Sequence, residues 1–198
     1  MLLSKRRVIV LLVAGVGLAA WLVMWWRFPK DTTPEGAYYR VAKAVSRDEP
    51  AMFFAYLETA AQHACFTIGD YRAKAKQRVL QSFPPAERQR ALAELEPYAS
   101  QSQGPEVFAL AAREQGWLAR LRQDLSGVDQ VEQEQERATV QTVRGTRYPF
   151  RRRENGIWGL TLFTPFLVEE AERAARDYEM YRNSALDYDR KAGKASEP

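Results

Sequence analysis

An uncharged apolar run near the amino terminus constrains this chain more than any other feature. Residues 8–26 read VIVLLVAGVGLAAWLVMWW, without a charged residue or a proline. At about 1.5 Å of rise per residue, a helix of this length just crosses a hydrocarbon core about 30 Å thick. Three tryptophans gather at its far end, where indole side chains favour the membrane–water interface. We therefore predict a single-pass transmembrane signal anchor.

The anchor interpretation competes with that of a cleaved signal peptide. The small residues of Gly17-Leu18-Ala19-Ala20 resemble a cleavage site, but the apolar run continues beyond them without interruption. This continuation favours an uncleaved anchor. The residues expected to face lipid or the interface are Val8, Leu12, Leu18, Trp21, Leu22, Trp25 and Trp26.

Basic residues flank the apolar run unequally. Lys5, Arg6 and Arg7 precede it together with the amino terminus, whereas Arg27 and Lys30 follow it. The positive-inside rule then places residues 1–7 in the cytoplasm. We expect residues 27–33 to form a tether and the remainder to lie in the periplasm or another extracytoplasmic space.

The net charge of +4 belongs to this membrane flank. Lys5, Arg6, Arg7 and Arg27 are four of the 29 basic residues, which leaves 25 basic against 25 acidic residues in the rest of the chain. A domain without a surplus of positive charge lacks the electrostatic footprint of a nucleic-acid-binding protein. We therefore expect no nucleic-acid partner, and we expect the membrane and other protein subunits as partners.

Few side chains are suited to catalysis or to metal binding. Cys65 and His63 are the only residues of their types, so neither an internal disulfide nor a structural zinc site can be completed. Two helical residues at i and i+2 diverge by about 200°, which separates this thiol from this imidazole. We interpret Asp70, beside Tyr71, as a helix-surface residue. The sequence thus predicts no catalytic residue, no metal site and no cofactor.

Residues 34–125 show the apolar spacing of helices, and the period shortens from about four to two after residue 128. Helices are expected from Pro34, over 51–57, from Thr59 to about Gln81, over 86–96, and over 105–125 with a bend at Gly116. Strands are expected over 128–134, 138–143, 147–153 and 157–163. The pattern predicts an α+β fold, with a helical segment packed on a three- or four-stranded antiparallel meander.

The last two strands carry the clearest local signal of the domain. Asn155-Gly156 predicts a type I′ hairpin turn, because both residue types tolerate a positive φ. On the returning strand, Trp158, Leu160 and Leu162 are expected on one face. The hairpin should therefore present a row of large apolar side chains to the helices.

A long amphipathic helix is predicted over residues 166–191, followed by a flexible tail over 192–198. Its apolar residues recur at alternating steps of four and three, which is the spacing of a heptad seam. We interpret this seam as a surface for self-association or for another subunit. An equally favoured alternative is that it packs on the domain's own helices. The seam consists of Leu167, Ala171, Ala174, Tyr178, Tyr181, Ala185 and Tyr188.

A cluster of arginines near the hairpin has two interpretations. Arg144, Arg147, Arg151 and Arg153 are candidates for an anionic site that binds headgroups, a cell-wall polymer or an acidic patch of a partner. The alternative, which we favour, is cross-strand pairing with the acidic residues of the preceding strand or loop. Those acidic residues are Asp129, Glu132, Glu134 and Glu136.

Two stretches of the chain resemble a known family. TPEGAYYRVAKAVSRDEPAMFFAYL is similar to the first helices, and RATVQTVRGTRYPFRRRENGIWGLTLF to the final strands, of NTF2-like domains with the cystatin-like cone. The resemblance implies a cone-shaped α+β domain over residues 34–165, with a pocket between sheet and helices. Two features depart from the family pattern. Residues 59–125 are predicted to be helical, where the family usually has an early strand, and the last helix lies beyond the usual end of the domain.

The NTF2-like superfamily includes enzymes as well as binding and assembly modules, so the fold alone does not decide the function. We expect a non-enzymatic, membrane-tethered binding or assembly subunit of an envelope complex. The alternative is an anchored NTF2-like domain that binds or hydrolyses a small molecule. A pocket with convergent polar groups that include Asp70 or His63 would favour the alternative. A pocket filled by Trp158, Phe150 and Phe54 would favour the first.

Overall fold

The computed structural model describes residues 29–101 and 103–193 of the 198-residue chain. The predicted anchor at residues 8–26 and the predicted tail beyond residue 193 lie outside this range. From Asp31 onward the chain forms one compact unit, which includes the last helix. None of the helices in the described ranges is both long and apolar enough to cross a membrane.

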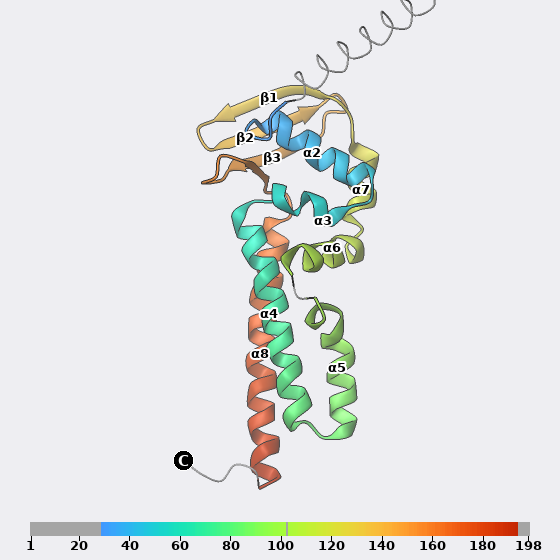
Figure 1. The fold of residues 1–198 in the computed structure, drawn as a ribbon, viewed down its shortest axis with the longest axis vertical. Helices are drawn as coiled ribbons and strands as arrows, with labels where there is room; N and C mark the ends of the chain where they lie inside the picture. The colour runs from blue at the N-terminus through green and yellow to red at the C-terminus, as the bar shows by residue number, and fades with distance from the viewer. Residues whose placement is uncertain (1–28, 102, 194–198) are drawn as a thin grey trace, which may run out of the picture. The chain divides into compact units, whose positions relative to one another are not determined.

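The described part of the chain is α+β, as predicted (Figure 1). Its N-terminal half is helical, and Gly116, with φ +64°, breaks the predicted bent helix into two. The elements are α2 (Pro34–Ser46), α3 (Pro50–Phe53), the 3₁₀ helix η1 (Phe54–Tyr56), α4 (Thr59–Ser82), α5 (Pro85–Ala99), α6 (Gly104–Glu114), α7 (Trp117–Asp124), β1 (Val128–Glu134), β2 (Arg137–Thr142), β3 (Arg147–Arg152), β4 (Trp158–Leu160) and α8 (Thr164–Lys191).

The four strands form one antiparallel sheet in the order β1-β2-β3-β4, which confirms the predicted meander. The last strand is shorter than predicted, because it ends at Leu160 instead of Phe163. Thr161 turns the chain there, donating its backbone N–H to the Pro149 carbonyl at 3.0 Å. Leu162 therefore leaves the apolar face of the sheet and is 45% exposed.

The β2–β3 and β3–β4 hairpins share one loop geometry. In the first, Gly145 N donates to Thr142 O and Thr142 N donates to Thr146 O; in the second, Gly156 N donates to Arg153 O and Arg153 N to Ile157 O. Gly145 and Gly156 have φ of +84° and +80°. These are three-residue loops ending in a left-handed glycine bulge. The predicted type I′ turn is wrong, because Asn155 does not adopt the positive φ that such a turn requires.

A first hydrophobic core lies between the sheet and the helices around it. α2 packs against the sheet, and the first turns of α4 and α8 meet α3, α6 and α7 beneath it (Figure 1). Trp158, Phe150 and Phe54 are 1%, 2% and 8% exposed, so their side chains fill the space between sheet and helices. The alternating burial of β2 and β3 explains this core, because one face of each strand points into it.

The second core belongs to α4, α5 and the second half of α8, which together we call the helical arm. α4 and α8 run side by side away from the sheet, and α5 returns along α4 (Figure 1). The buried residues of this core are Ala75, Val79, Phe83, Ala91, Leu95, Tyr181 and Ala185.

The helices α4 and α8 are parallel, and their contacts keep a nearly constant spacing along the sequence. Glu58 bonds Thr164, 106 residues later, and Ser82 bonds Asp189, 107 residues later. The same offset of 106 matches the seam of α8, residue by residue, with an equally spaced row on α4. That row is Ala61, Cys65, Ile68, Arg72, Ala75, Val79 and Ser82.

The seam of α8 is therefore occupied within the chain. Leu167, Ala171, Ala174, Tyr181 and Ala185 are buried, and Tyr178 and Tyr188 pack against the second core. The interpretation of the seam as a partner surface is corrected to the packing alternative, because these side chains already cover α4 and α5. A heptad pattern shows which face of a helix is buried, but it does not identify the helix that covers it.

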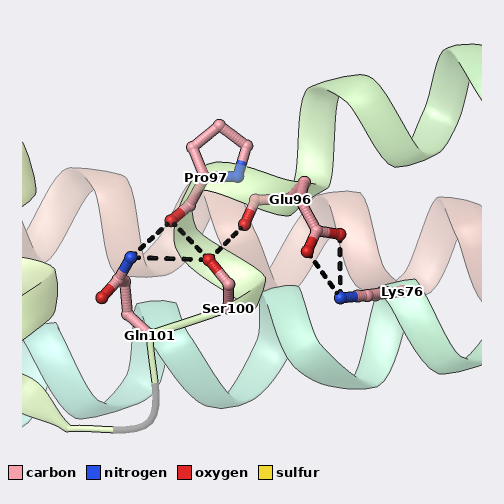
Figure 2. Close-up of polar contacts among 5 residues, drawn as sticks. All are labelled: Lys76, Glu96, Pro97, Ser100 and Gln101. Carbon is pink, nitrogen blue, oxygen red and sulfur yellow. Dashed lines mark hydrogen bonds and ion pairs between the residues drawn. The ribbon is translucent and has the colours of Figure 1, made fainter.

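Polar contacts fasten the end of α5 to α4. Lys76 Nζ of α4 lies 2.8 Å from Glu96 of α5, and the Ser100 hydroxyl donates to the Glu96 carbonyl at 2.8 Å (Figure 2). The Gln101 amide donates to the Pro97 carbonyl at 3.2 Å. The Glu96 carbonyl also accepts from the Ser100 backbone N–H at 3.1 Å, so the Ser100 hydroxyl is a second donor to it.

Candidate functional site

Cys65 and His63, which the sequence analysis interpreted as facing apart, lie in different environments on α4. Cys65 is fully buried between the helices, and burial raises the pKa of its thiol to about 12. His63 is exposed on another face of α4, and the exposed Asp70 pairs with Lys74 at 2.6 Å. Within the described residues, no group of three or more His, Cys, Asp or Glu side chains is placed to hold a metal ion.

The four arginines of the predicted anion patch have separate partners. Arg147 of β3 pairs with Glu132 of β1 at 2.6 Å, across the intervening strand β2. Arg151 pairs with Glu58 at 2.8 Å, and Arg153 Nη1 donates to the Ala55 carbonyl at 2.6 Å. Arg144 donates to the Gln123 carbonyl. They do not converge on one point, so the four together are not an anion site.

Two of these arginines border a cleft that the sequence did not reveal. The cleft has a volume of about 370 Å³ and lies between α7, the start of β3 and the start of α8. Its lining residues are Trp117, Arg120, Leu121, Asp124, Thr146, Arg147, Tyr148, Leu162, Phe163 and Phe166. Arg147 lines it directly, and Arg144 reaches α7 beside it.

Local turns place the aromatic wall of the cleft. The left-handed Gly116 starts α7 at Trp117, and the turn at Thr161 places Phe163 before α8. The two rings stack at 4.3 Å between centroids with 22° between planes, and Phe166 meets Trp117 edge-on at 5.2 Å. Together they form a continuous apolar wall.

The floor of the cleft is buried and its rim is charged. Trp117, Leu121, Tyr148 and Phe163 are between 2% and 8% exposed. At the rim, Arg120 and Asp124 lie one turn apart on α7, yet no ion pair joins them in the described structure; Arg120 donates to the Gln115 carbonyl instead. A basic residue four positions before an acidic one is the less favourable order for an i,i+4 ion pair, and the open pair leaves both charges available to a ligand.

Tyr148 gives the cleft an unused hydrogen-bonding group. Its hydroxyl is buried and has no partner among the described residues. The neighbouring Tyr38, 5.3 Å away between ring centroids, is satisfied because its hydroxyl donates to the Ser126 carbonyl at 2.8 Å. Burial first, then Tyr38 and Asp124, raise the pKa of Tyr148 to about 12, so at neutral pH the group is a protonated donor. An unpartnered buried hydroxyl is uncommon in folded proteins.

Arg147 is the one lining residue of the cleft that the sequence singled out as a candidate site residue. Trp117 and Leu121 lie in the helical range predicted over 105–125, and the structure places both at the floor of the cleft. The unpaired rim and the orphan hydroxyl of Tyr148 have no sequence signal, because they depend on how α7 meets β3.

Comparison with protein-family models, with curated proteins and with solved structures finds no match. The resemblance to NTF2-like domains therefore stays a prediction. The family-type pocket between sheet and helices is filled here by Trp158, Phe150 and Phe54. The open cleft also lies between sheet and helices, where the start of β3 meets α7 and α8, and neither Asp70 nor His63 lines it. Its chemistry is that of a binding site with an apolar floor, a charged rim and one buried donor.

Proposed function

We propose that this chain is a non-enzymatic, membrane-tethered binding subunit of an envelope complex, with residues 8–26 as its anchor and the cleft as its binding site. The observation that carries the proposal is the cleft beside Trp117. Concave sites with a mostly apolar lining and a few directed polar groups are the usual places where proteins hold ligands or anchoring side chains.

Two features support binding over the alternative of an NTF2-like domain that hydrolyses or holds a small molecule in its cone. Trp158, Phe150 and Phe54 fill part of the space between sheet and helices, where the cone pocket would lie. The residues that would suggest acid–base chemistry there, His63 and Asp70, are exposed on α4.

The membrane tether rests on the sequence, and the start of the folded unit is compatible with it. Trp158 binds the incoming chain twice, through its backbone N–H to the Asp31 carbonyl at 3.4 Å and through its indole N–H to the Thr32 carbonyl at 3.1 Å. The folded unit thus begins within a few residues of the predicted anchor.

Site-specific photocrosslinking tests the binding site in the native membrane. A benzophenone amino acid replaces Leu162, which is 45% exposed in the cleft, or Leu186, which is 52% exposed on the helical arm and serves as the matched control. We expect a discrete adduct from position 162 and none from position 186. Equal adducts from both positions, or an adduct from position 186 alone, would contradict a specific site at the cleft.

Mass spectrometry of the same membrane-purified protein tests the anchor. We expect residues 8–26 to remain attached to the folded unit. A mature amino terminus near Ala20 or Trp21 would show that the run is a cleaved signal peptide.

A further inference from the structure

We propose that the cleft binds a small organic anion with a flat apolar body, of which an aromatic carboxylate is the simplest example. This rests on the proposed function only in taking the cleft as a binding site, and it does not depend on the membrane anchor. The body lies against the wall formed by Trp117 and Phe163, and the anionic group reaches the rim at Arg120.

The shape of the wall selects a flat group. Trp117 and Phe163 stack nearly parallel, and Phe166 stands edge-on to Trp117, so the wall is built from three aromatic rings. Aromatic pairs prefer such offset or edge-to-face contacts over other packings. Leu121 closes the floor, and the half-exposed Leu162 extends the apolar surface toward solvent.

The charges around the rim select an anion. Two guanidinium groups, of Arg120 and Arg147, line the cleft against one carboxylate, that of Asp124. Arg147 is already paired with Glu132. Within the described residues, the Arg120 guanidinium binds only the Gln115 carbonyl and has no carboxylate partner. Guanidinium groups bind carboxylates through charge-assisted hydrogen bonds.

The buried hydroxyl of Tyr148 supplies the inner contact. Tyr148 lines the cleft, its hydroxyl is buried, and nothing in the described structure accepts its proton. A ligand oxygen placed there would satisfy a donor that the free protein leaves unpaired. Tyr148 therefore acts as a specificity-determining residue that favours a ligand with an acceptor close to its ring system.

The test uses the full chain in lipid nanodiscs, with empty nanodiscs as the blank. Isothermal titration calorimetry measures 2-naphthoate, and then 2-naphthylmethanol, which has the same rings without the charge. We expect saturable 1:1 binding of 2-naphthoate and an affinity at least about tenfold lower for the alcohol, which lacks the charge-assisted bond. Equal affinity for the two compounds, or no heat above the blank, overturns the proposal.

Matched variants tie the binding to the cleft. Arg120→Gln should weaken 2-naphthoate binding about tenfold, whereas Arg90→Gln, at an exposed position of α5, should not change it. Tyr148→Phe should weaken binding while the ligand-free melting temperature stays the same or rises, because it removes an unpaired buried group. Tyr188→Phe on the helical arm is its control.

These outcomes separate this inference from the proposed function. If 2-naphthoate does not bind but position 162 still forms its specific adduct, the cleft holds a different occupant and only the ligand class is overturned. If the cleft variants and the control variants weaken 2-naphthoate binding equally, the binding lies outside the cleft and the inference is also overturned.

Discussion

Glu58, the residue before α4, accepts a hydrogen bond at 2.8 Å from the hydroxyl of Thr164, the first residue of α8. The same carboxylate pairs with Arg151 of β3 at 2.8 Å and is 6% exposed. One acidic side chain thus joins the starts of both long helices to the sheet. Because the two helices are parallel, this contact fixes their relative register at its origin.

Removing this carboxylate should destabilise the fold. We expect Glu58→Ala to lower the free energy of unfolding by about 1–3 kcal/mol, since it leaves the Thr164 hydroxyl and the inner side of Arg151 without an acceptor. Urea unfolding followed by circular dichroism measures the change. Asp70→Ala is the control: its pair with Lys74 is exposed on both sides, so the loss should stay below about 0.5 kcal/mol. Equal losses of unfolding free energy in the two variants would show that the buried contacts of Glu58 stabilise the fold no more than an exposed ion pair does.

Charges in the seam should unfold the helical arm. Tyr178→Glu with Tyr181→Glu places carboxylates in the second core, and the second of them faces Glu94, to which the Tyr181 hydroxyl now donates at 3.2 Å. Buried unpaired charges are among the most destabilising substitutions. We expect a loss of helical circular dichroism.

The matched control for the seam is Met180→Glu with Leu186→Glu, at positions of α8 that are 55% and 52% exposed. This variant should keep the helical signal and the melting temperature of the unchanged protein. If the seam variant stayed folded, the packing of α8 on α4 described above would be wrong.

The hairpin glycines should be required for stability because they adopt positive φ angles. Gly156→Ala puts a Cβ at φ +80°, which costs about 1–2 kcal/mol for an L-residue. Gly127→Ala is the comparison, because Gly127 has no positive φ and its added Cβ would meet Val143 at an ordinary 3.8 Å. Thermal melts should show a loss only for the first variant. Similar melting temperatures would contradict the glycine-bulge assignment.

Gly159 is expected to be sensitive for a different reason, which is space. A Cβ at this position would lie 2.7 Å from the backbone of Glu58 and from the Leu57 carbonyl oxygen. Those atoms belong to the segment that pairs with β4, where Glu58 N donates to Leu160 O at 3.1 Å. Gly159→Ala should therefore cost about 1–3 kcal/mol of unfolding free energy. A melting temperature equal to that of Gly127→Ala would show that the two segments separate easily.

Alkaline pH should destabilise the protein through buried phenols. The pKa values of Tyr148 and Tyr181 are raised to about 12 from 10.0, mainly by burial. Below pH 10 both states keep these protons. Between about pH 10 and 12 the unfolded chain loses them while the folded chain does not, so the free energy of unfolding falls by about 1.4 kcal/mol per pH unit for each phenol.

Replacement of both phenols tests this pH dependence. In Tyr148→Phe with Tyr181→Phe, the decline of the unfolding free energy between pH 10 and 12 should be shallower than in the unchanged protein. The buried Cys65 thiol, whose pKa is also raised to about 12, continues to contribute in the same direction. An unchanged slope would mean that the two phenols ionise equally well in the folded and unfolded states.

The apolar periodicity predicted the helices and strands of this fold better than it predicted which of them pack against each other. The change of period near residue 128 located the sheet, and the steps of four and three located the buried face of α8. The matching row on α4 is harder to recognise, because Arg72 interrupts it; its guanidinium lies 2.8 Å from Asp177 and its side chain is only 13% exposed. A charged residue in an apolar row suggests a solvated face until its partner is seen.

The hairpin shows a second limit of sequence reasoning. Asn155-Gly156 correctly located a turn, but the pair is compatible with more than one turn type. The length of the loop decides between them, and that length depends on where Arg153 and Ile157 pair. The cleft is harder to predict than the hairpin. Its wall joins Trp117, which precedes the four strands in the sequence, to Phe163 and Phe166, which follow them.

The nearly constant sequence offset between α4 and α8 couples the lengths of the two helices in the helical arm. Each seven-residue repeat adds about 10 Å to its length, because a helix rises about 1.5 Å per residue. A single-residue insertion in either helix rotates all later seam positions by about 100° and breaks the match between the two rows. Seven residues added at matching positions of both helices would keep the two rows in register. Matched additions of whole repeats to both helices would therefore lengthen the arm while the seam stays in register.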